Sequence, residues 1–189
     1  SASRYSPGPR RLTEKNALAG VIHITTKRGA SGAQVETGGG YGSHNRQKVW
    51  ANLSGGLQGF DYFLAGARER DHGYRNHSDA DIGTAQLKLG RKYGDRSDIV
   101  VSYTRADDRL EQPGSLTGTE IAQDRRQNIS AVDYVSKMDF FTVSQRQALP
   151  WDFSLAVNGH LRERTEDSPL NRGRSSVSRY LAKQRSRGL

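Results

Sequence analysis

The chain has 189 residues, a formal net charge of +9, an apolar fraction of 33% and a mean hydropathy of −0.80. No stretch approaches the roughly 18 consecutive apolar residues of a membrane-spanning helix, which excludes a helical membrane protein. The chain has no cysteine, which excludes a disulfide scaffold, a zinc–thiolate site and a cysteine nucleophile.

A short β-prone run follows two small residues near the N-terminus. Residues 16–29 read Asn-Ala-Leu-Ala-Gly-Val-Ile-His-Ile-Thr-Thr-Lys-Arg-Gly. Ala19 and Gly20 permit a close approach of two backbones, and Val21, Ile22 and Ile24 favour an extended conformation. We therefore expect a short strand at this point, packed closely against another segment.

Alternating apolar and polar residues predict a series of strands, each with one apolar face. The alternation is clearest in residues 48–54, 84–89, 99–104 and 153–158, and it is weaker in 60–68 and 140–147. The apolar face would comprise Val49, Leu53, Leu87, Leu89, Ile99, Val101, Leu155 and Val157. The polar face would comprise Asn52, Thr84, Gln86, Lys88, Ser102, Ser154 and Asn158.

The connections between these strands alternate in length. Residues 55–59, 94–97 and 149–152 are compact and rich in turn residues, whereas residues 70–81 and 106–138 are long and polar. Such asymmetry is typical of an outer-membrane barrel, and a soluble β-sandwich has no reason to segregate its loops in this way. We therefore favour an all-β fold, an antiparallel meander that forms part of a transmembrane β-barrel.

The longest polar connection contains a helix-capping pattern. Thr117 and Glu120 have the spacing of a capping box, which would start a short helix within residues 116–127. A plain loop remains an equal alternative for this segment.

Positive charge is concentrated at the C-terminal end. Residues 162–189 hold seven Arg and one Lys against three acidic residues, which gives five of the nine net positive charges. Ser, Arg and Gly dominate residues 168–189, and such a composition predicts a disordered basic tail.

Residues 16–29 closely resemble the end of the plug domain in TonB-dependent outer-membrane receptors, where the chain passes into the first barrel strand. The residues that carry this resemblance are Asn16, Ala17, Leu18, Gly20, Val21, Ile22 and Ile24. His23 stands where the family usually has Asn, and residues 13–15 replace the expected Tyr-Gly-Ser. Residues 39–42, 71–75 and 112–126 are similar to a strand end and two outer loops of the siderophore-receptor relatives, so the resemblance extends over residues 16–167.

The resemblance implies a division of the chain into three parts. Residues 1–29 would be a short remnant of the plug, poorly matched over 1–15. Residues 30–167 would form about seven strands from the start of the barrel, and 168–189 the tail. Barrels of this family have 22 strands, which at about 10 residues each need about 220 residues. We therefore expect this fragment to transport nothing by itself.

The resemblance also implies a function, a location and a ligand-binding region. The full-length receptor would import an iron–siderophore or a similar scarce chelate across the outer membrane of a Gram-negative cell. Its partners would be outer-membrane lipid and the TonB complex that supplies the energy. The side chains that would contact the ligand lie in the outer loops: His72, Tyr74, Arg75, Arg125 and Arg126.

Three other functions deserve comparison with this one. His72, His77, Asp79 and Asp81 offer metal ligands, but their spacing matches no compact site, so we expect a solvated loop, no metal and no cofactor. The carboxylates in residues 111–133 have no His or nucleophile at a defined spacing, so we expect no enzyme and no catalytic residue. The main alternative is a soluble, basic β-rich module whose tail binds nucleic acid or another polyanion. No nucleic-acid-binding motif accompanies the tail, and for the receptor we expect no nucleic-acid partner.

Overall fold

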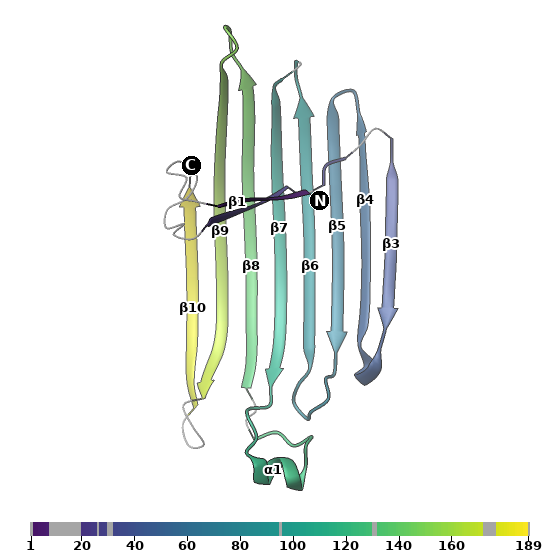
Figure 1. Cartoon of the computed structure of the whole chain (residues 1–189), viewed down its shortest axis with the longest axis vertical. Coiled ribbons are helices and arrows are strands. Elements are labelled where there is room, and N and C mark those ends of the chain that lie inside the picture. Colours follow the sequence, from purple (N-terminus) through teal and green to yellow (C-terminus); the bar gives the residue numbers. More distant parts are fainter. Residues whose placement is uncertain are drawn as a thin grey trace.

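The computed structural model describes residues 2–7, 20–25, 27–29, 32–94, 96–129, 132–171 and 177–188. Within these, it describes the backbone alone for 2–7, 20–25, 169–171 and 177–180. Eight strands form one antiparallel meander in which neighbours in sequence are neighbours in the sheet (Figure 1). They are β3 (Gln34–Tyr41), β4 (Gln47–Leu57), β5 (Phe60–Asp71), β6 (Ala80–Lys92), β7 (Asp98–Gln112), β8 (Val132–Ala148), β9 (Ser154–Asn171) and β10 (Val177–Gly188).

The remaining elements are few. Strands β1 (Ala2–Pro7) and β2 (Gly20–Thr25) pair antiparallel in a separate two-stranded sheet. A 3-10 turn, η1 (Ser43–Asn45), precedes β4, and a helix, α1 (Gly118–Gln123), lies between β7 and β8. The expected all-β antiparallel meander is therefore confirmed, as a sheet in which β3 and β10 are the two edges and do not pair with each other.

The pairing register confirms the two expected faces of the sheet. Directly paired residues of neighbouring strands project from the same face, and side chains alternate between faces along each strand. Leu87 pairs with Leu64 on one side and with Tyr103 on the other, whereas Lys88 pairs with Phe63 and Ser102. Every position expected on the apolar face shares the face of Leu87, and every position expected on the polar face shares that of Lys88.

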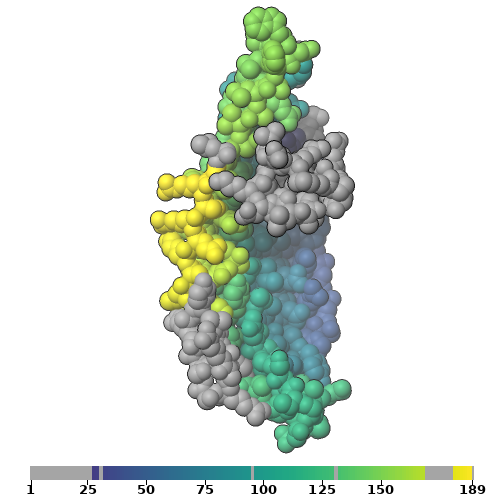
Figure 2. Space-filling view, turned by 60° about the vertical axis from the view of Figure 1, so that its left-hand side comes forward, coloured from purple at the N-terminus to yellow at the C-terminus, as the bar shows by residue number. Residues whose placement is uncertain are grey.

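The two ends of the sheet carry connections of different length, as the sequence predicts. At one end, β4 and β5 are joined through Gln58 and Gly59, whose φ angles of 50° and 82° suit a two-residue hairpin turn. The described residues of the β6–β7 and β8–β9 connections complete that end, and residues 42–46, 72–79 and 113–129 lie at the opposite end. Figure 2 shows the molecule from the β10 side, with the β8–β9 turn (light green) and the α1 region (dark green) at opposite ends.

The long connection contains the short helix α1, so of the two alternatives for residues 116–127 the helix is correct and the plain loop is not. The Thr117 side chain accepts a hydrogen bond from the Glu120 backbone N–H, and the Glu120 side chain accepts one from the Thr117 backbone N–H. These reciprocal bonds satisfy donors that a helix start would otherwise leave unpaired. The capping box predicted from the sequence is thus present.

The expected loop 106–138 was too long, because β7 continues to Gln112 and β8 begins at Val132. Polar strand ends can keep the ladder when opposite charges lie across from each other. Here Arg105 contacts Asp107 at 2.8 Å and Asp139, on the neighbouring strand, at 3.4 Å. These strands therefore continue without an apolar face. Strand bounds predicted from apolar alternation alone are too short here.

The disordered tail predicted for residues 168–189 is wrong for 168–171 and 177–188, the part of it that the structure describes. Strand β9 extends to Asn171, and β10 pairs with it along its whole length. The Glu163 carboxylate of β9 forms ion pairs with two residues of β10, Lys183 at 2.6 Å and Arg185 at 3.0 Å. The positive charges that suggested disorder are paired with acidic residues of the neighbouring strand. Those acidic residues lie before residue 168, so the composition of the tail alone does not reveal the pairing.

Very little of the sheet is buried. Among the described residues, Phe63 and Val132 are the buried apolar side chains, and no large side chain is fully buried. A sheet this size normally needs a covered apolar face to offset the entropy lost on folding. The stability of this sheet therefore depends on whatever lies against its apolar face.

Candidate functional site

The apolar face of the sheet is exposed over nearly its whole width. Its large side chains belong to all eight strands of the sheet and retain between about 40% and 70% of their accessible surface. They include Val35, Val49, Leu53, Leu64, Leu87, Leu89, Tyr103, Phe141, Leu155, Val157, Leu161 and Leu181. A contiguous apolar patch of this extent marks a membrane or protein contact.

Most of the exposed apolar side chains form a band near the short-turn end, whereas Leu181 lies toward the long loops. On β9, the band runs from Leu155 to Leu161, about 20 Å along the strand at about 3.4 Å per residue. Charged pairs replace it on the same face toward the long loops, where Arg68 and Arg70 contact Asp81 at 2.7 and 3.3 Å. A lipid-facing barrel surface has an apolar band about 25 Å tall, with polar surface beyond it. One face of the sheet is thus divided into an apolar part and a charged part.

The opposite face carries a partly buried charge cluster at the junction with the N-terminal region. The Arg28 guanidinium donates to both Asp61 oxygens, at 3.1 and 2.6 Å, and also to Asp98. Lys88 lies beside this cluster, with 6% of its surface exposed, and donates to the backbone carbonyl of Lys27 at 3.0 Å. The hydrogen bonds with Asp61 are the largest cause that raises the pKa of Arg28, so this guanidinium stays charged. Residues 27–29 are thereby tied to strands β5, β6 and β7.

Gly90 makes room for this junction. A Cβ atom built on Gly90 would lie 2.5 Å from both the Arg28 Nη2 and the Asp61 Oδ2 atoms. Gly90 also pairs directly with Asp61, so the crossing of Arg28 over β6 uses the space that a side chain would fill. The absence of a side chain here has a packing reason.

We expect Gly90→Ala to displace Arg28 and to destabilise the chain by about 1–3 kcal/mol, the usual cost of overpacking. The measurement is thermal unfolding of the chain in detergent micelles, followed by tryptophan fluorescence. Gly66→Ala is the matched control, because its Cβ would meet nothing closer than 4.0 Å. Equal losses in the two variants would mean that strand glycines, and not the junction, matter.

Arg75 joins the two long loops. Its guanidinium donates to the backbone carbonyls of Gln127, at 2.8 Å, and of Pro113 and Gly114. A planar guanidinium is well suited to bind several acceptors at once. This side chain, one of the expected ligand contacts, thus holds the loop 113–131 against the loop 72–79.

The other expected ligand contacts lie around this connection. The Tyr74 ring is half exposed and packs against His44, and the Arg126 guanidinium lies 5.8 Å from its centre. His72 contacts Asp79 at 3.0 Å, and Arg125 is exposed. The structure therefore brings four of the five side chains to the β5–β6 loop and the adjacent part of the long loop, with Arg125 next to Arg126 in sequence. Their contact with a ligand stays a prediction.

We expect Arg75→Ala to release the loop 113–131, because three backbone carbonyls lose their donor at once. Limited proteolysis with trypsin should then cleave faster after Arg125 or Arg126, by about tenfold if the lost bonds are together worth about 1.4 kcal/mol. Arg96→Ala, at an exposed pair with Asp152, is the control. Unchanged cleavage in Arg75→Ala would show that the loops are held by other contacts.

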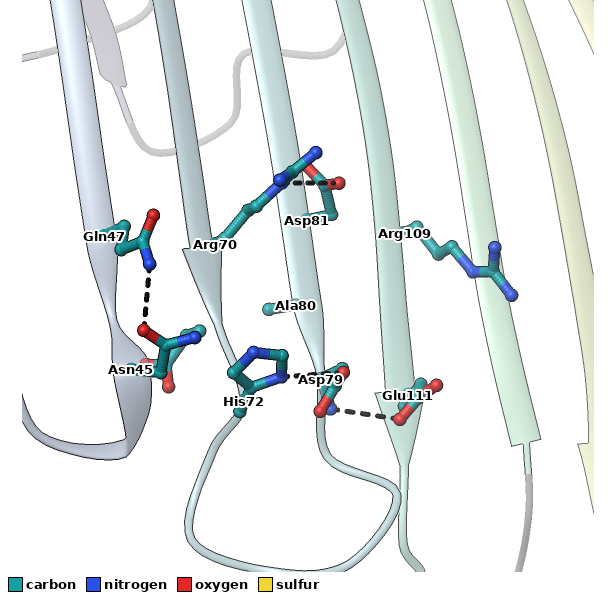
Figure 3. A pocket seen from close by; sticks show the side chains of 10 residues that line it. Asn45, Gln47, Arg70, His72, Asp79, Ala80, Asp81, Arg109 and Glu111 are labelled. Atoms are coloured by element: carbon teal, nitrogen blue, oxygen red, sulfur yellow. Dashed lines mark hydrogen bonds and ion pairs between the residues drawn. The ribbon is translucent and has the colours of Figure 1, made fainter.

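A shallow polar depression lies beside these loops. Figure 3 shows its lining, in which Arg70 points toward Asp81, and Asp79 lies between His72 and Glu111. The Asp79 backbone N–H donates to the Glu111 carboxylate at 3.2 Å. The four possible metal ligands His72, His77, Asp79 and Asp81, for which the sequence predicts a solvated loop, do not form one cluster. Asp81 contacts the arginines, and His77 lies with Glu111 and Asp133.

The family motif is only partly described. Asn16, Ala17 and Leu18 lie outside the described residues, whereas Gly20, Val21, Ile22 and Ile24 belong to the backbone of β2, in the extended conformation that the sequence predicts. No protein-family model matches the chain. Within the part of the chain that the structure describes, no helix is long and apolar enough to cross a membrane.

Sequence reasoning missed the charge cluster at the junction. Arg28 lies near the end of residues 16–29, the segment that carries the resemblance, but Asp61 and Asp98 are 33 and 70 residues away from Arg28. The sequence shows only that Asp61 follows a tight turn and that Gly90 lies on the next strand. These two positions become neighbours once the pairing register of β5 and β6 is known. A pairing model of the strands would have been needed to find it.

Proposed function

We propose that the chain is part of a TonB-dependent outer-membrane receptor that imports an iron–siderophore or a similar scarce chelate. The observation that carries the proposal is the broad exposed apolar face of a sheet with almost no core of its own. The opposite face is rich in polar and charged residues and binds residues 27–29, the end of the segment that resembles the plug. This arrangement is consistent with a strand set that has lipid on one side and a polar lumen on the other.

The proposal implies an orientation of the sheet across the outer membrane. The chain passes from the plug remnant to β3 at the end with short turns, so this end would face the periplasm. The long loops would then face outward, and His72, Tyr74, Arg75, Arg125 and Arg126 would surround the approaching chelate. In the full-length receptor, the TonB complex would supply the energy for import.

The experiment is flotation with lipid vesicles at low and high salt. The chain is refolded in the presence of zwitterionic and anionic vesicles and centrifuged through a density gradient. The receptor proposal predicts flotation with both vesicle types that persists at high salt, because an apolar face in hydrocarbon is not screened. The alternative, a soluble basic module, predicts a chain that remains in solution with zwitterionic vesicles and leaves anionic ones as salt rises. The second pattern would contradict the receptor proposal.

A further inference from the structure

Three metal-competent side chains from distant parts of the sequence meet at the long-loop end. His77 belongs to the β5–β6 loop, Glu111 lies near the end of β7, and Asp133 lies near the start of β8. One ligand atom from each lies within 4.8 Å of the others. The cluster is separate from the junction at Arg28 and from the loop contacts of Arg75.

The pairing of β7 with β8 places two carboxylates opposite each other. Glu111 and Asp133 are direct cross-strand partners, and like charges in such a position destabilise a sheet unless a positive charge lies between them. Arg109 reaches only the Oδ2 atom of Asp133, at 3.6 Å. The Oδ1 atom, on the His77 side, is left for another positive group.

Two buried atoms at the centre of the cluster lack a hydrogen bond. They are His77 Nε2 and Asp133 Oδ1, which lie 3.2 Å apart without the geometry of a hydrogen bond between them. Two ligands bound to one Zn²⁺ ion at about 2.0–2.1 Å in tetrahedral geometry lie about 3.3 Å from each other. The separation of these two atoms is thus that of neighbouring ligands of one ion.

The backbone at His77 is also unusual. Its φ angle of +57° is in the left-handed region, which is uncommon and strained for residues other than glycine. The Ser78 hydroxyl, which donates to the carbonyls of His72 or Arg75, fixes the loop in this conformation. The strained residue is therefore the one that turns an imidazole toward the two carboxylates.

We propose that His77, Glu111 and Asp133 bind a divalent transition metal of the Zn²⁺ type. An imidazole nitrogen with two carboxylate oxygens suits Zn²⁺ better than Mg²⁺ or Ca²⁺, which prefer oxygen ligands alone. Three protein ligands leave a coordination position for water. The ion neutralises the facing carboxylates and fastens the β5–β6 loop to the base of the β7–β8 connection.

The test is calorimetric titration of the full chain with Zn²⁺, with Co²⁺ absorption as a second measurement. We expect one site and a Co²⁺ spectrum of low coordination number. His77→Ala and Asp133→Asn should weaken binding by about tenfold or more. His72→Ala, in the same loop, is the matched control and should bind as the unchanged chain does.

Two results would overturn the proposal. One is the absence of stoichiometric binding to the unchanged chain, which would leave His77 as a side chain that only contacts Glu111, at 3.5 Å, and Asp133, at 3.2 Å. The other is binding that survives His77→Ala, which would place the ion on another of the five histidines. The Co²⁺ spectrum of the unchanged chain requires no variant and remains informative if a variant fails to fold.

Discussion

Leu87→Arg is expected to impair insertion of the chain into lipid far more than Gln86→Arg. Leu87 lies in the apolar band, between Leu64 and Tyr103, with 38% of its surface exposed. A charged side chain on the lipid face of a barrel strand costs about 2–4 kcal/mol near the bilayer midplane. The next residue, Gln86, projects from the polar face beside Ala65 and Thr104, where an arginine can remain in water.

The measurement is the fraction of each variant that becomes protease-resistant after refolding with lipid vesicles. The two variants introduce the same side chain at adjacent residues of one strand, so their net charge is identical. A large loss of the protease-resistant fraction in Leu87→Arg alone is the result expected if Leu87 faces lipid and Gln86 faces the lumen. Equal losses would contradict the assignment of lipid and lumen sides.

Asp61→Ala is expected to loosen the junction between the N-terminal region and the sheet. It removes the main partner of Arg28 and leaves that guanidinium and the buried Lys88 close to each other with less negative charge between them. Loss of a charged hydrogen-bond partner in a mostly buried site costs about 2–3 kcal/mol, less than for a fully buried pair because Arg28 is partly exposed.

Hydrogen exchange in detergent micelles tests this expectation at the amides of residues 27–29 and of the neighbouring β5 and β6 ends. Asp152→Ala is the matched control, because Asp152 also pairs with an arginine, at 2.8 Å, but 85% of its side chain is exposed. Such surface pairs contribute little to stability. Faster exchange confined to Asp61→Ala supports a junction that holds the segment, and an equal response of both variants argues against it.

The strands and their faces could be predicted because they depend on local alternation. Val49, Leu53, Leu87 and Leu89 repeat every second residue, and a strand fixes the face of each from that period alone. The junction and the metal cluster could not be predicted, because Arg28 meets Asp61, and His77 meets Asp133, only through the register of several hairpins. The extent of β7 to β10 was missed for a related reason. These strands contain charged segments, and partners such as Asp139 for Arg105 and Glu163 for Lys183 lie on a neighbouring strand.

The most direct test of the account asks which face of the sheet contacts lipid. The chain has no cysteine, so single cysteines can be introduced and labelled with a fluorophore one position at a time. Suitable positions alternate along two strands: 86, 87 and 89 on β6, and 155, 157 and 158 on β9. In reconstituted bilayers, we predict quenching by lipid-borne nitroxide at 87, 89, 155 and 157, and quenching by aqueous iodide at 86 and 158. Quenching by iodide at all six positions, or with no alternation, would contradict a sheet whose apolar face lies against the membrane.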